Sequence, residues 1–177
     1  MKSLSHKLYM LYKAKPYASN KTLLLVYKTY ILPVIEYGDV IIHNTNSNLL
    51  AKIQRFQNRC IKFCMGLNVR TSTTLIHKLA RINMLNERRE SHLLNLAYKR
   101  SKSKFFTEEI NILTRAGNAP KLKNEIPKSN CYLTSVEYKT SALWSQTPLQ
   151  MKMIDSFPRF KDNNRNKLKD KLNNYPD

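Results

Sequence analysis

The stretch Tyr27-Lys-Thr-Tyr-Ile-Leu-Pro-Val-Ile-Glu-Tyr-Gly38 determines most of what can be expected of this fold. It continues a run of apolar residues that begins at Leu23, so the segment is apolar nearly all round, which is typical of a buried helix. Pro33 has no backbone donor, and its ring crowds the preceding turn. We therefore expect a buried helix that starts near Lys21, capped by Ser19 or Asn20, and that is kinked or interrupted at Pro33.

A second stretch, Ile53-Gln-Arg-Phe-Gln-Asn-Arg-Cys-Ile-Lys62, lies in the clearest helix of the chain, expected over residues 48–65. At about 100° per residue, one side of this helix collects apolar side chains and another side collects cations. Gly66 then follows as a C-cap. The apolar side carries Leu49, Ile53, Phe56, Cys60 and Cys64, and the cationic side carries Lys52, Arg55, Arg59 and Lys62.

The chain as a whole is expected to be mainly α-helical. Only three glycines occur among 177 residues, which argues against a turn-rich β-architecture. Residues 131–147 are predicted to form an irregular β-like or short helical patch around Trp144. Apolar periodicity predicts further helices over residues 3–15, 71–79, 85–98 and 156–173.

These predictions divide the chain into three parts. Residues 1–100 are expected to form a small helical bundle. Residues 101–130 are rich in Lys, Ser, Asn and Pro and show little periodicity, which is typical of a basic linker. Residues 131–177 are expected to form a small C-terminal segment that ends in a helix.

The charge of the chain is extreme. It has 31 Lys and Arg against 12 Asp and Glu, a net charge of +19 and a pI of about 10.0. Such a surplus attracts polyanions, with nucleic acid first and anionic lipid second. The longest apolar run, Leu23–Val26, is far short of the ~20 residues that a membrane span needs. Without a recognisable secretory signal or an even set of cysteines, we expect an intracellular, soluble protein that does not bind membranes.

No set of residues predicts catalysis. Two-metal polymerases and nucleases need clustered carboxylates, but the five aspartates (Asp39, Asp155, Asp162, Asp170 and Asp177) are scattered. Glu36 and Asp39 are better explained as a solvated or capping pair than as a metal site. A phosphate loop is excluded because the glycines stand singly. Zinc binding by Cys60, Cys64, His77 and His92 fits no common spacing, so we expect no catalytic residue, no metal and no cofactor.

The cationic row is the strongest functional signal. Lys52, Arg55, Arg59 and Lys62 recur at i, i+3, i+7 and i+10, a row about 15 Å long at 1.5 Å rise per residue. Such a row can follow phosphates of one duplex strand without reading sequence. An ordinary solvated helix face is the alternative. Gln54, Gln57 and Asn58 flank the row as further donors, and Arg88, Lys99 and Arg100 are additional candidate nucleic-acid contacts.

The residues Tyr27–Gly38 and Leu50–Asn58 resemble the region just after the polymerase core of LINE-type (non-LTR retrotransposon, jockey-like) reverse transcriptases. The family pattern is Tyr-Lys-(Ser/Thr)-x-(Ile/Leu)-x-Pro-x-(Ile/Leu)-(Glu/Asp)-Tyr-Gly, then Leu-x-(Lys/Arg)-(Ile/Leu)-Gln-(Arg/Lys)-x-Gln-(Asn/Arg). Residues 72–100 and the late stretch Thr114–Trp144 resemble later parts of such polyproteins. Where relatives have Leu-Trp-Asn-x-Leu-Pro, this chain has Ser145 and Thr147, which would fit a decayed copy.

The resemblance implies a thumb-like region and the helices after it, which in the family hold the template–primer duplex behind the active site. It brings no family catalytic residue, so an enzyme is not expected here, although the parent family is an RNA-directed DNA polymerase. The implied partners are an RNA–DNA hybrid or duplex, bound non-specifically, and the rest of a polymerase encoded upstream. The implied location is the nucleus and cytoplasm, within a ribonucleoprotein. A stand-alone basic helical adaptor for RNA or protein, and a non-functional genomic remnant, remain alternatives.

Overall fold

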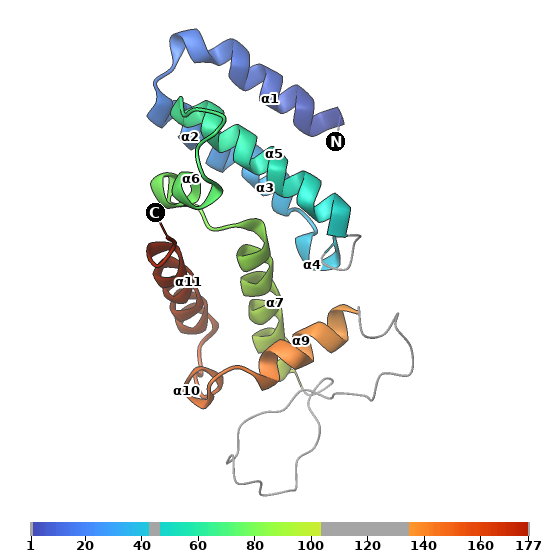
Figure 1. Ribbon diagram of the computed structural model, residues 1–177. Helices are drawn as coiled ribbons and strands as arrows, with labels where there is room; N and C mark the ends of the chain where they lie inside the picture. The colour runs from blue at the N-terminus through green and yellow to red at the C-terminus, as the bar shows by residue number, and fades with distance from the viewer. Residues whose placement is uncertain (1, 43–46, 104–134, 177) are drawn as a thin grey trace, which may run out of the picture. The chain divides into compact units, whose positions relative to one another are not determined.

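The computed structural model describes residues 2–42, 47–103 and 135–176, and these residues contain helices and no strand, which confirms the predicted mainly α-helical fold (Figure 1). They belong to two compact units. Unit 1 comprises Met1–Leu85 with Asp170–Asp177, and unit 2 comprises Asn86–Lys169. Among the described helices, none combines the length and the apolar character needed to cross a lipid bilayer.

Unit 1 is built around the segment Tyr27–Gly38, which contributes Tyr27, Ile31, Leu32 and Ile35 to the core. Its core is formed by buried side chains from every long helix of the unit, including Leu8, Leu23, Ile31, Ile61 and Ile76. Its elements are α1 (Lys2–Ala14), η1 (Lys15–Tyr17), α2 (Asn20–Val26), η2 (Tyr27–Ile31), α3 (Leu32–Glu36), α4 (Asp39–Ile42), α5 (Ser47–Met65) and α6 (Thr73–Ala80).

The predicted interruption at Pro33 takes the form of a π-helical segment, η2. The N–H of Leu32 donates to the carbonyl of Tyr27, five residues earlier. In a regular α-helix the proline ring would press on the carbonyl of Thr29, four residues before it. The wider turn just before Pro33 accommodates the proline while the helical path continues from α2 to α3. Tyr27 and Ile31 remain fully buried, so the segment keeps its place in the core.

Serine caps define the starts of two helices of unit 1. The Oγ of Ser19 accepts the N–H of Thr22 at 3.2 Å and so caps α2, which confirms one of the two predicted caps. Ser72 caps α6 in the same way through Leu75. Each cap satisfies one of the backbone donors that a helix N-terminus leaves without an intrahelical partner.

Gly66 ends α5 as the sequence predicted. Its φ is +66°, its N–H donates to the carbonyl of Phe63, and the N–H of Leu67 donates to the carbonyl of Lys62 at 2.9 Å. These two bonds form a Schellman motif, which needs a left-handed residue at the position of Gly66. A Cβ there would also lie 3.3 Å from Nδ2 of Asn20. The motif fixes the direction in which the chain leaves α5.

We expect Gly66→Ala to destabilise the protein by about 1–2 kcal/mol, because an L-residue is strained in the left-handed region. Chemical denaturation followed by circular dichroism measures this difference. Gly38→Ala is the matched control, since Gly38 has a φ of +70° and nothing within 4 Å of its added Cβ. We expect the loss of stability at Gly66 to be at least as large as that at Gly38, and a smaller loss at Gly66 would contradict this expectation.

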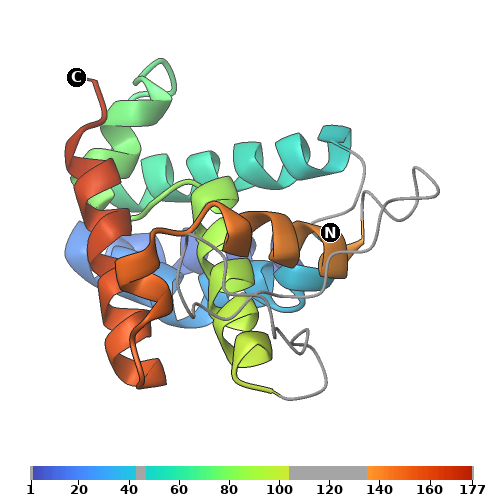
Figure 2. The same cartoon turned by 90° about the horizontal axis from the view of Figure 1, so that it is seen from below.

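Unit 2 packs three helices around aromatic rings. Trp144 of α9 (Val136–Ser145) and Phe160 of α11 (Phe157–Asn173) are buried against Ala97 and Tyr98 of α7 (Leu85–Ser101). The ring of Tyr98 lies 4.4 Å from that of Phe160 and 6.3 Å from that of Trp144, between centroids. Its hydroxyl donates to the carbonyl of Ile154, which follows the short helix α10 (Leu149–Lys152). Figure 2 shows α7 beside both α9 and α11.

These contacts differ from the sequence-based prediction in one place. Helix α7 was grouped with residues 1–100, whereas its aromatic contacts are with α9 and α11. Residues 131–147 were predicted to form an irregular β-like or short helical patch, and their described part contains the short helix α9. The linker expected over residues 101–130 lies mostly outside the described residues.

Candidate nucleic-acid interface

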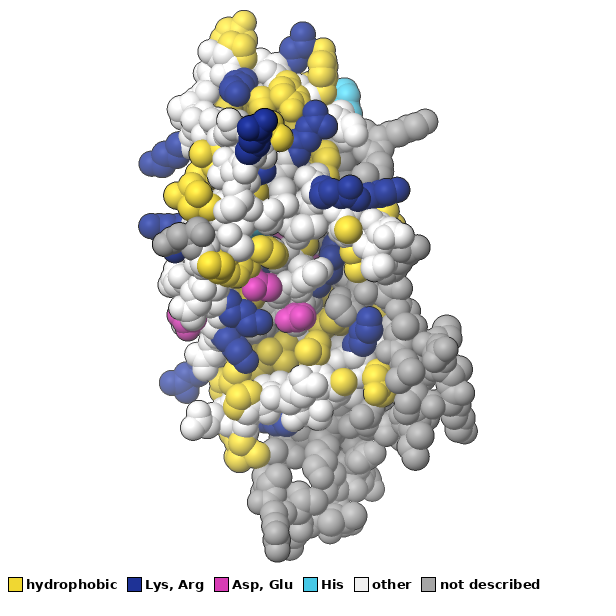
Figure 3. Space-filling model, in the orientation of Figure 1, with side chains coloured by type: hydrophobic (Ala, Val, Ile, Leu, Met, Phe, Trp, Pro, Cys, Tyr) yellow, Lys and Arg dark blue, Asp and Glu magenta, His cyan; other side chains and the backbone are white. Residues whose placement is uncertain are grey.

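The cationic row of α5 lies on an exposed face of unit 1. Lys52, Arg55 and Arg59 are exposed and Lys62 is half-buried. The opposite side of the helix faces the core and carries Gln57, Cys60, Ile61 and Cys64. Figure 3 shows Lys and Arg side chains, with hydrophobic groups between them and no carboxylate nearby, over α1 and α5 in the upper part of the view. In the sequence, no carboxylate occurs between Asp39 and Glu87.

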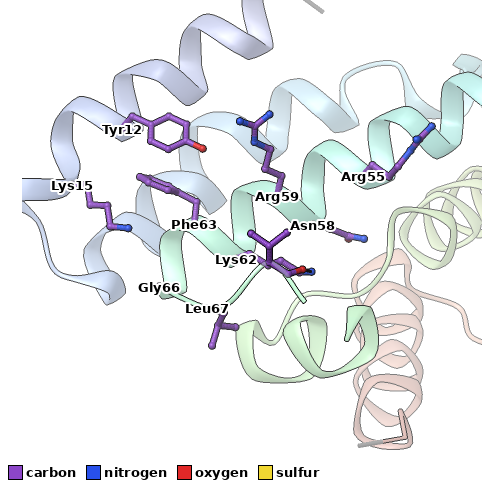
Figure 4. Close-up of a pocket in the computed structure, with 10 residues that line it drawn as sticks. Tyr12, Lys15, Arg55, Asn58, Arg59, Lys62, Phe63, Gly66 and Leu67 are labelled. Carbon is purple, nitrogen blue, oxygen red and sulfur yellow. Dashed lines mark hydrogen bonds between the residues drawn. The ribbon is translucent and has the colours of Figure 1, made fainter. Parts of the chain in front are cut away.

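Part of this row lines a groove of about 700 Å³. One wall is the C-terminal end of α1 and the residue after it, another is α5, and a third is the chain that follows Gly66 (Figure 4). The volume is within the range of about 300–1,000 Å³ typical of small-ligand sites. The lining residues are Tyr12, Lys15, Arg55, Asn58, Arg59, Lys62, Phe63, Gly66, Leu67 and Val69.

Two aromatic rings meet at the end of the groove. The centroids of Tyr12 and Phe63 are 4.1 Å apart, with the ring planes tilted by 52°. The ammonium of Lys15 lies 4.5 Å from the centroid of Phe63, within the range of a cation–π contact. Tyr12, Lys15 and Phe63 were not predicted as site residues from the sequence. No periodic signal could have done so, because about fifty residues separate the two aromatic rings along the chain.

Lys62 makes a hydrogen bond within the groove itself. Its Nζ donates to the carbonyl of Val69 at 2.5 Å and so holds the chain after α5 against the helix. Of the four predicted cations, Lys52, Arg55 and Arg59 are the exposed ones. Lys62 stabilises one wall of the groove through its hydrogen bond to Val69. This difference affects the number of phosphate contacts that the row can make.

The amides that flank the row were expected to be further donors to a ligand, and this expectation is corrected by the structure. Gln57 is fully buried. Gln54 donates to Oε1 of Gln57 at 2.9 Å and to Oδ1 of Asn58 at 2.8 Å, and it accepts the N–H of Leu85. Gln54 and Gln57 are used inside the protein because Leu85 and the helix α6 pack against this side of α5.

Histidine 77 completes this internal network. It is fully buried on α6, and its Nδ1 donates to the carbonyl of Ile82 at 2.7 Å. Its Nε2 accepts from Nε2 of Gln54 at 3.2 Å and lies 2.9 Å from Oδ1 of Asn58. Because buried polar groups are costly unless they are hydrogen-bonded, these contacts fix the position of α6 on α5. His77 is therefore a structural residue of the interface between the two helices.

The zinc alternative gains no support from the cysteines. Cys60 and Cys64 are fully buried among the apolar residues of the core, and burial raises the pKa of the Cys60 thiol to about 12 and that of the Cys64 thiol to about 11. The neighbouring Cys64 raises the Cys60 value further. In the described part of the chain, no three His, Cys, Asp or Glu side chains are grouped as a metal site would need.

We expect Cys60 and Cys64 to react with a thiol reagent at pH 8 at least about 100-fold more slowly than in the unfolded chain, because only the thiolate is reactive. A Cys131→Ser background leaves these two thiols to be counted.

The pKa values of both thiols are higher in the folded protein than in the unfolded chain. The two thiols therefore stabilise the fold below about pH 8.5 and lose that contribution as the pH rises toward 11 and 12. Rapid labelling of the folded protein would contradict the burial of both residues.

The remaining candidate contacts belong to α7. Arg100 donates to Oγ1 of Thr140 at 3.0 Å and forms an ion pair with Glu137 at 3.4 Å. Lys99 is exposed, with its ammonium 4.7 Å from the ring centroid of Phe157. Arg88 is half-buried. These three residues lie in unit 2, whereas every residue that lines the groove lies in unit 1.

No protein-family model matches the chain, and no curated protein or solved structure is significantly similar to it. The chemistry of the groove is therefore the basis for assigning a function. It combines two exposed cations of α5, Arg55 and Arg59, with an aromatic pair and no carboxylate among its lining residues.

Proposed function

We propose that unit 1 binds nucleic acid through the cationic face of α5, by contacts to phosphates that do not depend on sequence. The observation that carries this proposal is the exposed row of Lys52, Arg55 and Arg59 in a stretch free of carboxylates. Like charges on one helix face repel one another unless an anion is present. A polyanion with regularly spaced charges relieves this repulsion at all three positions.

The helix that carries the row favours this interpretation. Helix α5 has 19 residues and is fixed by its buried side and by the polar network with α6, so its cations have a defined spacing. Consecutive cations three and four residues apart match phosphates along one strand better than a scattered set of flexible lysines would. Contacts of this kind position a protein on a duplex or on an RNA–DNA hybrid and recognise its shape.

We further propose that this role is that of the thumb and post-polymerase region of a LINE-type reverse transcriptase. The resemblance of Tyr27–Gly38 and Leu50–Asn58 to that region supports the proposal, and the second of these stretches contains part of the cationic row. In this scheme the chain holds template–primer nucleic acid and does not itself carry out phosphoryl transfer. The catalytic aspartates would come from a palm domain encoded in the same reading frame upstream.

Genomic sequence can test this second proposal. Coding sequence in frame before Met1 that contains a palm aspartate pair is the expected result. A bounded, transcribed, single-copy gene without such sequence would instead favour the stand-alone adaptor. Neither result depends on the binding measurement, so membership of a polymerase and the capacity to bind nucleic acid are tested separately.

A salt series tests the binding proposal. We expect the logarithm of the association constant for a duplex to fall with the logarithm of salt concentration with a slope of about −3, because three exposed cations release about 0.9 counterion each. Fluorescence anisotropy with a labelled duplex of about 20 base pairs gives this slope. A slope near zero would show that phosphates are not the ligand of the row.

A further inference from the structure

We propose that the groove beside α5 also holds an unpaired nucleotide, with its base stacked on the ring of Tyr12 and its phosphate near Arg59. This inference rests on the proposed binding of nucleic acid. It adds that the protein binds a single strand or a single-stranded end more tightly than a duplex. The juxtaposition that carries it is an exposed aromatic ring and an exposed arginine lining the same groove.

Tyr12 has the exposure and the support that a stacking platform needs. Tyr12 is 39% exposed, although its sequence neighbour Leu11 is buried in the core of unit 1. The ring of Phe63 contacts it at 4.1 Å between centroids and limits the directions that it can take. Figure 4 shows Tyr12 and Phe63 facing each other, with the guanidinium of Arg59 on the same side of α5.

Phe63 is not equally available to a base. It is half-buried, and the ammonium of Lys15 lies 4.5 Å from its centroid. Tyr12 is therefore the ring that can accept a base, while Phe63 supports it and Lys15 adds positive charge close by. Aromatic rings bordered by cations are the features with which proteins bind single strands, because every base has a π-face and every nucleotide carries a phosphate.

The groove distinguishes an unpaired base from a paired one. In a duplex each base is stacked on its neighbours, so its face cannot contact a protein ring unless the base leaves the stack. An unpaired base can contact the ring without the cost of unpairing and leaving a duplex stack. The volume of about 700 Å³ is sufficient for a ligand of nucleotide size. The row on α5 would then hold phosphates of either form, and Tyr12 would add affinity for the unpaired form alone.

The test compares two probes and three substitutions by fluorescence anisotropy. The probes are an oligothymidine of about eight nucleotides and a blunt duplex of about 20 base pairs. Tyr12→Ala is expected to weaken binding of the single strand about 10-fold or more, since loss of one stacked base has an effect of this size. Duplex binding is expected to change by less than about 2-fold, because phosphate contacts remain.

Two controls isolate the stacking ring. Tyr12→Leu keeps an apolar contact with Phe63 but removes the aromatic face, so it is expected to weaken single-strand binding like Tyr12→Ala. Tyr9→Ala removes another exposed tyrosine of α1, one that does not line the groove, and is expected to leave both affinities unchanged. Thermal unfolding of each variant, followed by circular dichroism, shows whether α1 remains folded.

The outcomes separate this inference from the proposed function. If the wild-type protein binds duplex with the expected salt slope but Tyr12→Leu binds the single strand as well as wild type does, the stacking site is overturned and phosphate binding stands. Equal losses for both probes would also overturn it, because Tyr12 would then support the fold of the groove. If neither probe binds with a salt-dependent affinity, the proposed function itself fails.

Discussion

Replacement of both Arg55 and Arg59 by Glu is expected to lower the affinity for duplex nucleic acid by about 100-fold at moderate salt. Both side chains are exposed on the same face of α5 and both line the groove. Hydrogen bonds to charged groups contribute about 1.5–3 kcal/mol each, so loss of two such contacts accounts for about two orders of magnitude. Repulsion between the new carboxylates and phosphates adds to the loss. Fluorescence anisotropy with duplexes of unrelated sequence measures it.

The matched control changes the net charge by the same amount elsewhere. Arg159 and Arg165 are exposed on α11, and Arg159→Glu/Arg165→Glu alters the overall charge as much as the α5 variant does. We expect this control to lose much less affinity, because the effect of net charge alone is screened by salt. Equal losses in both variants would show that binding is a property of the whole basic chain. A loss confined to one duplex sequence would contradict contacts to the backbone.

Phe160→Ala is expected to destabilise unit 2 by about 3–5 kcal/mol, which is the usual cost of removing a buried phenyl group and leaving a cavity. Phe160 is fully buried, stacked on Tyr98 at 4.4 Å between centroids and 6.1 Å from Trp144. Trp144 is the only tryptophan of the chain and is buried in the same cluster. Its fluorescence emission therefore reports the unfolding of this unit in a denaturant titration.

The neighbouring substitution Arg159→Ala provides the control for Phe160→Ala. Arg159 is exposed on the same turn of α11, so its replacement is expected to change stability by less than about 0.5 kcal/mol. A Phe160→Ala protein that unfolds at the wild-type denaturant concentration would contradict the aromatic core of unit 2. The same result would question the packing of α7 with α9 and α11.

The sequence predicted those features that depend on local chemistry. The apolar periodicity of α5 and α11, the serine before α2 and the glycine after α5 each act within one or two turns of a helix, so a single sequence carries their signal. Pro33 likewise predicts an interruption, although only the structure shows that it takes the form of a π-helical segment. The exposed cations of α5 were predicted for the same reason.

The features that the sequence did not predict depend on residues far apart in the chain. Gln57 was expected on the polar side of α5, but it is buried because Leu85 and the helix α6 pack there through Gln54 and His77. The pairing of Tyr12 with Phe63 needs α1 to lie beside the C-terminal part of α5. Periodicity gives the faces of each helix but not which faces meet, so the groove itself was not predicted.

The most direct test of phosphate binding by α5 is the difference in salt dependence between the wild-type protein and the neutralised variant Arg55→Gln/Arg59→Gln. Each arginine that contacts a phosphate contributes about 0.9 to the slope, so the variant is expected to have a slope smaller in magnitude by about 2. Parallel lines for the two proteins would contradict the account, because they would mean that neither arginine displaces a counterion from the nucleic acid.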